Sequence, residues 1–230
     1  MKIRLAKALS SQGYCSRRSA EKLILEGKVR VNGACIKEVV CFVSQDDKLE
    51  VEGRIQPEND LKLWIYYKPK GLITTYSDPL SRHTVFENFP YNASRHLVSV
   101  GRLDINSEGL LLMTTSKSLA HTLEHPCNNF ARTYKVRTFG NLSDEVLQIK
   151  NGIIIDGIRY KPIKINVLQR GINSWLEMIL TEGKNREIRK ILEYFGLQVN
   201  RLIRTNYGPF SLEDLRPGEA MEVNLNKLKL

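Results

Sequence analysis

The chain has 230 residues and a mass of 26.4 kDa, and its 35 Lys and Arg against 25 Asp and Glu give a net charge of +10 at pH 7. A chain of this mass buries roughly 70% of the surface that its unfolded form exposes, enough for a core in one or two domains. Its 42% of hydrophobic residues excludes a disordered chain. The absence of any apolar run near the roughly 20 residues that span a bilayer excludes a membrane helix.

The basic charge is concentrated at the N-terminus. Residues 1–37 contain nine Lys and Arg against two Asp and Glu, whereas residues 38–60 contain two against seven. This change, together with the polar, Pro-containing segment 56–60, predicts a linker near residue 60. We therefore expect two domains, residues 1–60 and residues 61–230.

Residues 1–36 predict two short helices and a hairpin. Apolar residues at helical spacing begin at Ile3, and Gly13 ends that run. Ser16 is suited to cap a second helix, which ends at Glu26-Gly27. An alternating strand then leads to Asn32-Gly33, a typical hairpin turn. We expect a surface that neutralises RNA phosphates, formed by the cations that this fold leaves outside: Arg4, Lys7, Arg17, Arg18 and Lys28.

These motifs resemble a known RNA-binding module. The run from Arg4 through Ser16-Arg17-Arg18 to Val31-Asn32-Gly33 is similar to the module first described in ribosomal protein S-four, and the resemblance covers most of residues 1–50. The alternative is that the charges only solvate two surface helices. The excess of positive charge in the first 37 residues favours RNA binding.

Residues 61–225 predict a domain of mixed α and β structure in which strands are the majority. Strand-like runs bounded by Gly, Pro or Asn occupy residues 63–67, 109–114, 134–138, 153–155, 164–167 and 175–180. Asp156-Gly157 predicts a hairpin turn. Helices are expected at 116–124, 144–151 and 186–195, after Ser116, Ser143 and Asn185. The predicted fold class is therefore α+β: a small helix-pair-plus-hairpin domain, followed by a mainly antiparallel mixed sheet flanked by helices.

The N-terminus and the cysteines indicate an intracellular protein. Residues 1–7 carry charge, but no apolar stretch of secretory-signal length follows them. The cysteines show no spacing typical of a disulfide framework: Cys15, Cys35, Cys41 and Cys127. We expect a cytoplasmic location.

Two candidate metal sites do not meet the spacing that a metal requires. His121 and His125 stand four residues apart with Cys127 beyond them, but Pro126 interrupts the segment and no fourth ligand is near. A calcium loop opening at residue 104 would need Glu at its twelfth position, where the chain has Thr115. We predict no metal site.

A polar turn at residues 101–109 contains a candidate catalytic carboxylate. Arg102 and Asp104 fall on one face of an extended chain. A carboxylate held at the end of a strand, beside fixed positive charge, is suited to act as a nucleophile. The alternative is an Asp that only stabilises the turn.

Three further motifs accompany this turn. Residues 67–71 (YKPKG) follow a strand, residues 132–136 (RTYKV) open another, and residues 181–190 (TEGKNREIRK) join a strand to a helix. With the GRLDINSEGLLLMTT stretch, these motifs in this order resemble the pseudouridine synthases that modify ribosomal RNA, in the branch typified by RsuA and RluB. The resemblance runs from about Leu63 to Gly218.

The resemblance implies an isomerase and assigns three catalytic positions. It implies that Asp104 is the catalytic aspartate, Tyr134 the active-site tyrosine, and Arg189 the basic residue that pairs with the aspartate. The reaction breaks the bond from ribose to uracil N1, turns the base and rejoins it through C5, so it needs no cofactor. Burial disfavours an ionised carboxylate and a guanidinium favours it, which agrees with the role of Arg189. The sequence leaves open whether the carboxylate adds to the ribose or removes a ribose proton.

Each of these positions also has a structural alternative. Tyr134 offers a ring on which a flipped uracil could stack, but an isolated Tyr in a strand often packs in the core. Arg189 stands four residues before Glu193, so an ion pair within the helix competes with the catalytic role. Further cations expected around the pocket as RNA-binding residues are Lys68, Arg102, Lys184 and Arg186.

Two departures from the family pattern are visible. Ser107 stands where many members have Thr, which keeps the hydroxyl group. Arg186-Glu187 stands where His-Gln is common, which changes the charge beside the pocket. Neither departure removes a residue to which the resemblance gives a catalytic role.

The sequence favours a pseudouridine synthase that acts on ribosomal RNA, and RNA of the large subunit is favoured over that of the small. We expect a monomer. The substrate is either free RNA or a pre-ribosomal particle. The alternative is a non-catalytic RNA-binding factor of ribosome assembly that retains the fold. A transfer RNA substrate also stays open. DNA binding is disfavoured because no recognition-helix or zinc-finger pattern accompanies the charge.

Overall fold

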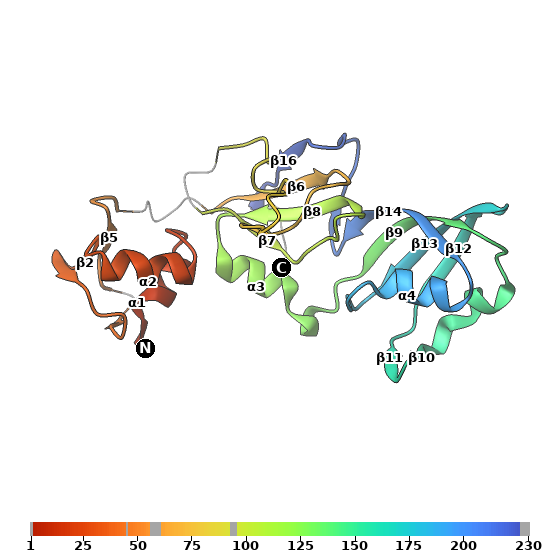
Figure 1. Ribbon diagram of the computed structural model, residues 1–230, viewed down its shortest axis with the longest axis horizontal. Helices are drawn as coiled ribbons and strands as arrows, with labels where there is room; N and C mark the ends of the chain where they lie inside the picture. The colour runs from red at the N-terminus through yellow and green to blue at the C-terminus, as the bar shows by residue number, and fades with distance from the viewer. Residues whose placement is uncertain (1, 45, 56–60, 93–95, 226–230) are drawn as a thin grey trace.

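The computed structural model describes residues 2–44, 46–55, 61–92 and 96–225, and it confirms the α+β fold class (Figure 1). Among these residues, the main sheet has nine strands, seven of them in the order β12-β13-β9-β14-β8-β6-β16. Helices α1 and α2 lie at one end of the molecule, and β12 and β13 lie at the other (Figure 1). The linker predicted at residues 56–60 falls outside the described residues. No helix in the described part of the chain is long and apolar enough to cross a membrane.

The N-terminal residues form the predicted helix pair and hairpin. The Ser16 hydroxyl accepts a hydrogen bond from the Ser19 N–H at 3.1 Å and so caps the second helix. Asn32 and Gly33 both have positive φ, 52° and 83°, as the predicted hairpin turn requires. The first helix begins only at Leu5, because residues 3–4 pair with a later strand. The elements are β1 (Ile3–Arg4), α1 (Leu5–Ser11), α2 (Arg17–Leu25), β2 (Val29–Val31), β3 (Ala34–Ile36), β4 (Phe42–Val43) and β5 (Leu49–Val51).

The first half of the main sheet is covered on both faces. Every residue of β6 (Leu63–Lys68) and β8 (Glu108–Thr114) is buried. Alternate residues of these strands pack against α3 (Lys117–Glu124), and the others pack against the segment 72–89. The Ser116 hydroxyl caps α3 as predicted, since it accepts a hydrogen bond from the Leu119 N–H at 3.2 Å.

The second half of the sheet packs against α4 (Glu187–Tyr194). Buried and partly buried residues alternate along β13 (Asn173–Leu180), which is the pattern of a sheet with one covered face. Tyr134 packs against the core under α4 and also against the core under the segment 72–89. These two covering elements therefore lie on the same face. The remaining strands of this half are β9 (Arg132–Phe139), β12 (Lys164–Gln169) and β14 (Gln198–Tyr207), whereas β10 (Ile153–Ile155) and β11 (Ile158–Tyr160) form a separate two-stranded sheet.

Three details differ from the sequence predictions. The helix expected at residues 144–151 is a 3-10 helix with a kink at Ile149. The N-cap of α4 is Arg186, in the left-handed conformation, instead of Asn185. The longest strand, β14, was not predicted because charged and polar residues interrupt its apolar pattern. Smaller elements complete the fold: β7 (Val98–Val100), β15 (Phe210–Ser211), β16 (Ala220–Glu222) and the 3-10 helix η1 (Pro126–Asn128).

One parallel contact joins the two halves of the sheet. Strands β14 and β8 pair with Arg204 beside Gly109, whereas the other ladders of this sheet are antiparallel. Gly109 has φ of +104°, and a Cβ atom there would lie 2.3 Å from the Arg204 carbonyl oxygen. Only glycine permits this close approach. The contact sets the position of the turn at residues 101–107, which leads directly into β8.

Candidate active site

A cavity of about 1120 Å³ opens where the two halves of the sheet meet. Its lining includes the turn at residues 101–107, the segment 73–78, and the loop that joins β13 to α4. All three catalytic residues assigned by resemblance line this cavity: Asp104, Tyr134 and Arg189. The fold thus brings together residues that lie up to 85 positions apart in the sequence.

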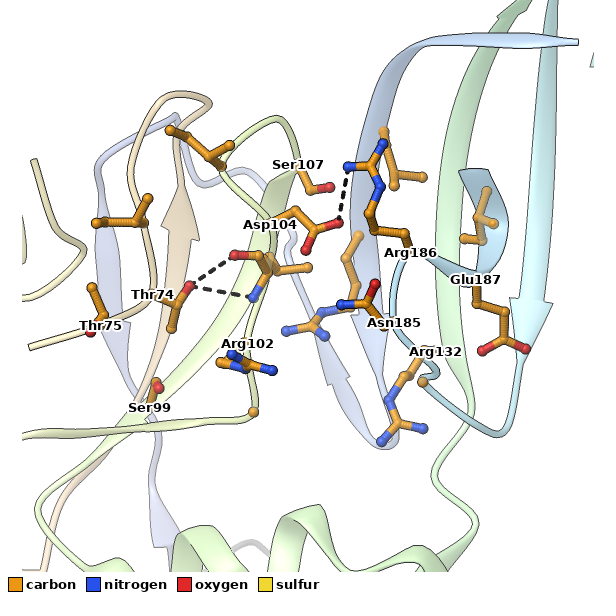
Figure 2. A pocket seen from close by; sticks show the side chains of 18 of the residues that line it. Thr74, Thr75, Ser99, Arg102, Asp104, Ser107, Arg132, Asn185, Arg186 and Glu187 are labelled. Atoms are coloured by element: carbon orange, nitrogen blue, oxygen red, sulfur yellow. Dashed lines mark hydrogen bonds and ion pairs between the residues drawn. The ribbon is translucent and has the colours of Figure 1, made fainter. Parts of the chain in front are cut away.

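The turn that carries Asp104 is held by hydrogen bonds with residues 71–74 and with Glu124 of α3. The Thr74 hydroxyl donates to the Leu103 carbonyl oxygen at 3.0 Å, and the Gly71 N–H donates to that of Ile105 at 2.8 Å. The Glu124 carboxylate accepts from the Gly101 N–H at 2.5 Å. Leu103 is buried, whereas the Asp104 side chain is 39% exposed. The carboxylate therefore faces the cavity from a rigid turn (Figure 2).

Lys68 lies beneath this turn and does not reach the surface. Its ammonium donates to the Ser107 carbonyl oxygen at 2.8 Å and to the Pro69 carbonyl oxygen at 3.0 Å, and the residue is 0% exposed. Burial lowers the pKa of Lys68 to about 8, although Asp104 and Glu108 act in the opposite direction. The predicted RNA contact by Lys68 is therefore wrong for this structure, in which the side chain supports the turn.

The cation nearest to Asp104 is Arg186. Its Nη1 atom lies 4.0 Å from Asp104 Oδ2, and Figure 2 shows the two side chains pointing toward each other. Arg186 is half exposed and has a positive φ of 52°, which is uncommon for a residue with a side chain. Sequence reasoning placed Arg186 at the pocket as an RNA-binding residue but gave it no contact with the aspartate.

Arg189 lies next to the same turn but contacts its backbone. The guanidinium donates from Nη2 to the Asn106 carbonyl oxygen at 2.9 Å and from Nη1 to that of Val199 at 3.1 Å. Burial lowers the pKa of Arg189, as does the charge of Arg186, whereas Asp104 raises it. Among the described residues Arg189 forms no ion pair within 4.0 Å with Asp104, and none with Glu193. The expected direct pairing with the aspartate is thus replaced by a link to the turn.

Tyr134 lies on β9 and lines the cavity. It is partly buried and packs against two hydrophobic cores, so both its predicted role and its structural alternative have support. Its neighbour across the strand pair is Arg204 of β14. The side chain therefore both packs against the hydrophobic cores and lines the cavity.

The other predicted cations fall into three environments. Arg102 is exposed at the cavity, whereas Lys184 lines it and forms an ion pair with Glu182. Lys28 forms ion pairs with two glutamates in the N-terminal region. The remaining N-terminal cations are exposed and lie away from the cavity lining: Arg4, Lys7, Arg17 and Arg18.

The sequence did not reveal one buried cation of the cavity, Arg204, and did not indicate that Glu187, already placed beside the pocket, is buried. Arg204 is 3% exposed, and its position in the unpredicted strand β14 gave no signal. Glu187 is 4% exposed and accepts a hydrogen bond from the Lys184 N–H at 2.9 Å. Burial raises the pKa of Glu187 to about 7, and the nearby Glu182 charge acts in the same direction. Figure 2 shows Glu187 turned away from Asp104, so it stabilises the loop of Arg186 from behind.

The described residues contain no group of three or more His, Cys, Asp or Glu side chains arranged to hold a metal ion. His125 Nδ1 and Cys127 Sγ lie 2.9 Å apart, and His121 is a neighbour of His125. These are pairwise contacts, and in the described part of the chain they do not bring three such side chains into an arrangement that could hold a metal ion.

Two family models match the chain. The model described as RNA pseudouridylate synthase matches residues 62–194, and the model described as S4 domain matches residues 3–39. A crystal structure of a pseudouridylate synthase has the same fold, with a TM-score of 0.69 at 24% identity over 98% of this chain and 97% of the other.

Curated relatives agree with these matches. A protein of Rickettsia felis named uncharacterized RNA pseudouridine synthase is 52% identical over 98% of both chains. A similarly named protein of Rickettsia typhi is 50% identical over 98% of this chain and 93% of its own length. Ribosomal large subunit pseudouridine synthase B of Yersinia pestis is 39% identical over 91% of this chain and 68% of its own length. The chain is therefore a member of the RNA pseudouridylate synthase family, with an S4 domain at its N-terminus.

Proposed function

We propose that this protein converts a specific uridine of large-subunit ribosomal RNA to pseudouridine, as a monomer in the cytoplasm. The observation that carries the proposal is a single cavity lined by Asp104, Tyr134 and Arg189, on a chain of this family. The similarity to a large-subunit enzyme of Yersinia pestis supports the choice of RNA. Free RNA and pre-ribosomal particles are both candidate forms of the substrate.

Asp104 is the residue that acts on the ribose. Addition to C1′ and removal of the C2′ proton both require an ionised carboxylate, held where the sugar of a flipped nucleotide can reach it. The rigid turn supplies the position, and Arg186 places a guanidinium nitrogen 4.0 Å from the carboxylate. The uracil released from C1′ then turns within the cavity and rejoins through C5, so the product has the same atoms as the substrate.

Tyr134 holds the base during this turn. Its side chain lines the cavity, where a flipped uracil can stack on the ring. The phenol is suited to accept the C5 proton, and N1 gains a proton in exchange, which completes the reaction.

The N-terminal domain, residues 1–60, contributes affinity, and residues 61–230 contain the catalytic domain. Arg4, Lys7, Arg17 and Arg18 are exposed and available to phosphates. Two linked RNA-binding units raise the effective concentration of one site for the other. The Gly13 carbonyl oxygen accepts a hydrogen bond from the His96 N–H at 2.7 Å, and Lys117 Nζ donates to Ser10 Oγ at 2.9 Å. These contacts favour a defined orientation of the two units.

The test is to map pseudouridines after incubation of the protein with unmodified transcripts. Large-subunit RNA, small-subunit RNA and a transfer RNA pool are treated in parallel, and carbodiimide adducts are located by primer extension. We expect one new pseudouridine in large-subunit RNA. Modification confined to transfer RNA would contradict the proposed substrate. Binding without modification, also in assembling particles, would favour the assembly-factor alternative.

A further inference from the structure

Arg204 is a buried cation of the cavity for which the reaction described above has no use. It belongs to β14, is 3% exposed, and lines the same cavity as Asp104 and Tyr134. Burial of a guanidinium is costly unless its donors are paired, so this residue requires an explanation.

The guanidinium is held in one position. Its Nε donates to the Leu110 carbonyl oxygen at 2.7 Å, and its central carbon lies 5.2 Å from the centroid of the Tyr207 ring. The backbone beneath it is fixed by the close contact with Gly109. A side chain fixed in this way presents its remaining donors in a set direction.

Those remaining donors have no acceptor. Among the described residues, neither Nη atom of Arg204 has a hydrogen-bond partner, and Nη2 is also closed to solvent. No ion pair of Arg204 with a carboxylate is present in the described part of the chain. Buried donors are almost always satisfied in folded proteins. Nη2 is closed to solvent, so the donor that a ligand in the cavity can reach is Nη1, which is not among the closed atoms.

The position of Arg204 identifies that ligand as the base. Arg204 is the cross-strand neighbour of Tyr134, the residue on which we expect the flipped uracil to stack. Arg102 and Arg186 are exposed and so lie where phosphates can approach, whereas the buried Arg204 is within reach only of a group that enters the cavity. Uracil has two carbonyl oxygens that accept hydrogen bonds, and a guanidinium has only donors.

We propose that Arg204 recognises the target base by donating a hydrogen bond to a carbonyl oxygen of uracil. This inference rests on the proposed function and adds a specificity residue to it. If the oxygen is that on C4, the same donor would oppose the amino group that cytosine has at this position, which explains a preference for uridine. The oxygen on C2 would provide affinity without this discrimination.

The experiment combines protein variants with single-atom changes in the RNA. A synthetic RNA that contains the mapped uridine is prepared with uridine, 2-thiouridine or 4-thiouridine at that site, because sulfur accepts hydrogen bonds more weakly than oxygen. Single-turnover rates are measured by nucleoside analysis for the wild-type protein, Arg204→Met and Arg132→Met. Arg132 is the matched control: it lies over the same Tyr207 ring at 4.9 Å, but its Nη atoms donate to protein acceptors such as the Thr181 carbonyl oxygen.

We expect one of the two thio substitutions to slow the wild-type protein by about 10-fold or more, and Arg204→Met to slow conversion of the oxygen-containing RNA by about 10- to 100-fold. The rate of Arg204→Met should then fall no further when that thio-RNA replaces the oxygen-containing RNA. The rate of Arg132→Met should fall by the same factor as that of the wild type. The proposal would be overturned if Arg204→Met lost as large a factor in rate on each thio-RNA as the wild type does, because the two changes would then act independently.

Two outcomes keep this test separate from that of the proposed function. A wild-type protein that converts none of the RNAs would refute the proposed function itself, and the role of Arg204 with it. If Arg204→Met does not fold, as judged by circular dichroism, the wild-type rates decide. Equal rates on all three RNAs would overturn the role of Arg204 while leaving the proposed function intact.

Discussion

Five cations in or next to the cavity form two groups that differ in what their donors contact. Lys68, Arg189 and Arg204 donate to backbone carbonyl oxygens of the strands and turns around Asp104. Arg102 and Arg186 are exposed, and Arg186 lies 4.0 Å from the carboxylate of Asp104. The first group shapes the site and the second is free to meet phosphates. Positive charge alone therefore does not identify an RNA contact.

Among these cations, the largest effect is expected from Arg189, which both supports the turn and places a positive charge near Asp104. Arg189→Met removes the hydrogen bond to the Asn106 carbonyl oxygen and a positive charge near Asp104. We expect kcat to fall about 100-fold with a much smaller change in KM, as is typical when a preorganised donor is lost. Steady-state kinetics on the mapped RNA measure this, with Lys190→Met on the same helix as control. An unchanged kcat would indicate that Arg189, like Arg102 and Arg186, serves to bind phosphates and does not shape the site.

The burial of Lys68 predicts that the stability of the protein depends on pH. The pKa of Lys68 is about 8 in the folded protein, below its ordinary value, so the unfolded chain binds more protons above pH 8. The contribution of Lys68 to stability therefore rises with pH between about 8 and 10. The free energy of unfolding in urea, measured at pH 7.5 and 9.5, should rise by about 1 to 3 kcal/mol more in the wild type than in Lys68→Met. Equal changes in both proteins would show that Lys68 is not buried as described.

Arg186 represents the exposed group. Arg186→Met should raise KM about 10-fold and reduce the salt dependence of RNA binding by about one phosphate contact. Because its contact with Asp104 is at the limit of an ion pair, we expect kcat to change less than in Arg189→Met. The KM and kcat values of the two variants, measured side by side, test the distinction. A loss confined to kcat would place Arg186 with the residues that shape the site.

The smallest effects belong to the N-terminal cations. Arg17→Ala and Arg18→Ala each remove one exposed charge far from the cavity lining. We expect each to weaken RNA affinity a few-fold and to lower the salt slope by about one, with kcat unchanged. Filter binding at several salt concentrations measures both quantities. Glu21→Gln is the charge control, and it should raise affinity slightly if the surface of this helix faces RNA.

The sequence predicted those parts of the fold that depend on local signals. Ser16 and Ser116 cap helices through their own hydroxyl groups, and the Asn32-Gly33 turn follows from the conformations that these residues tolerate. Each of these features is decided by residues within a few positions of one another. The order of the motifs also led to the family and to the residues that line the cavity.

The missed features depend on contacts between distant segments. Lys68 is buried because β6 is covered on both faces, which its own sequence does not reveal. Strand β14 is stabilised by pairing with β9 and β8, and its charged residues obscured the strand pattern. The contact of Arg186 with Asp104 follows from the left-handed conformation at the start of α4. Tertiary structure, not local preference, set these positions.

The central claim is that Asp104 carries out the chemistry at the ribose. The direct test is release of tritium from large-subunit RNA labelled at C5 of uracil, with the wild type, Asp104→Asn and the control Asp144→Asn, whose carboxylate pairs with Arg170 away from the cavity. We predict release by the wild type and the control, and none above background by Asp104→Asn, although it still binds the RNA. Tritium release by Asp104→Asn at the wild-type rate would contradict the claim.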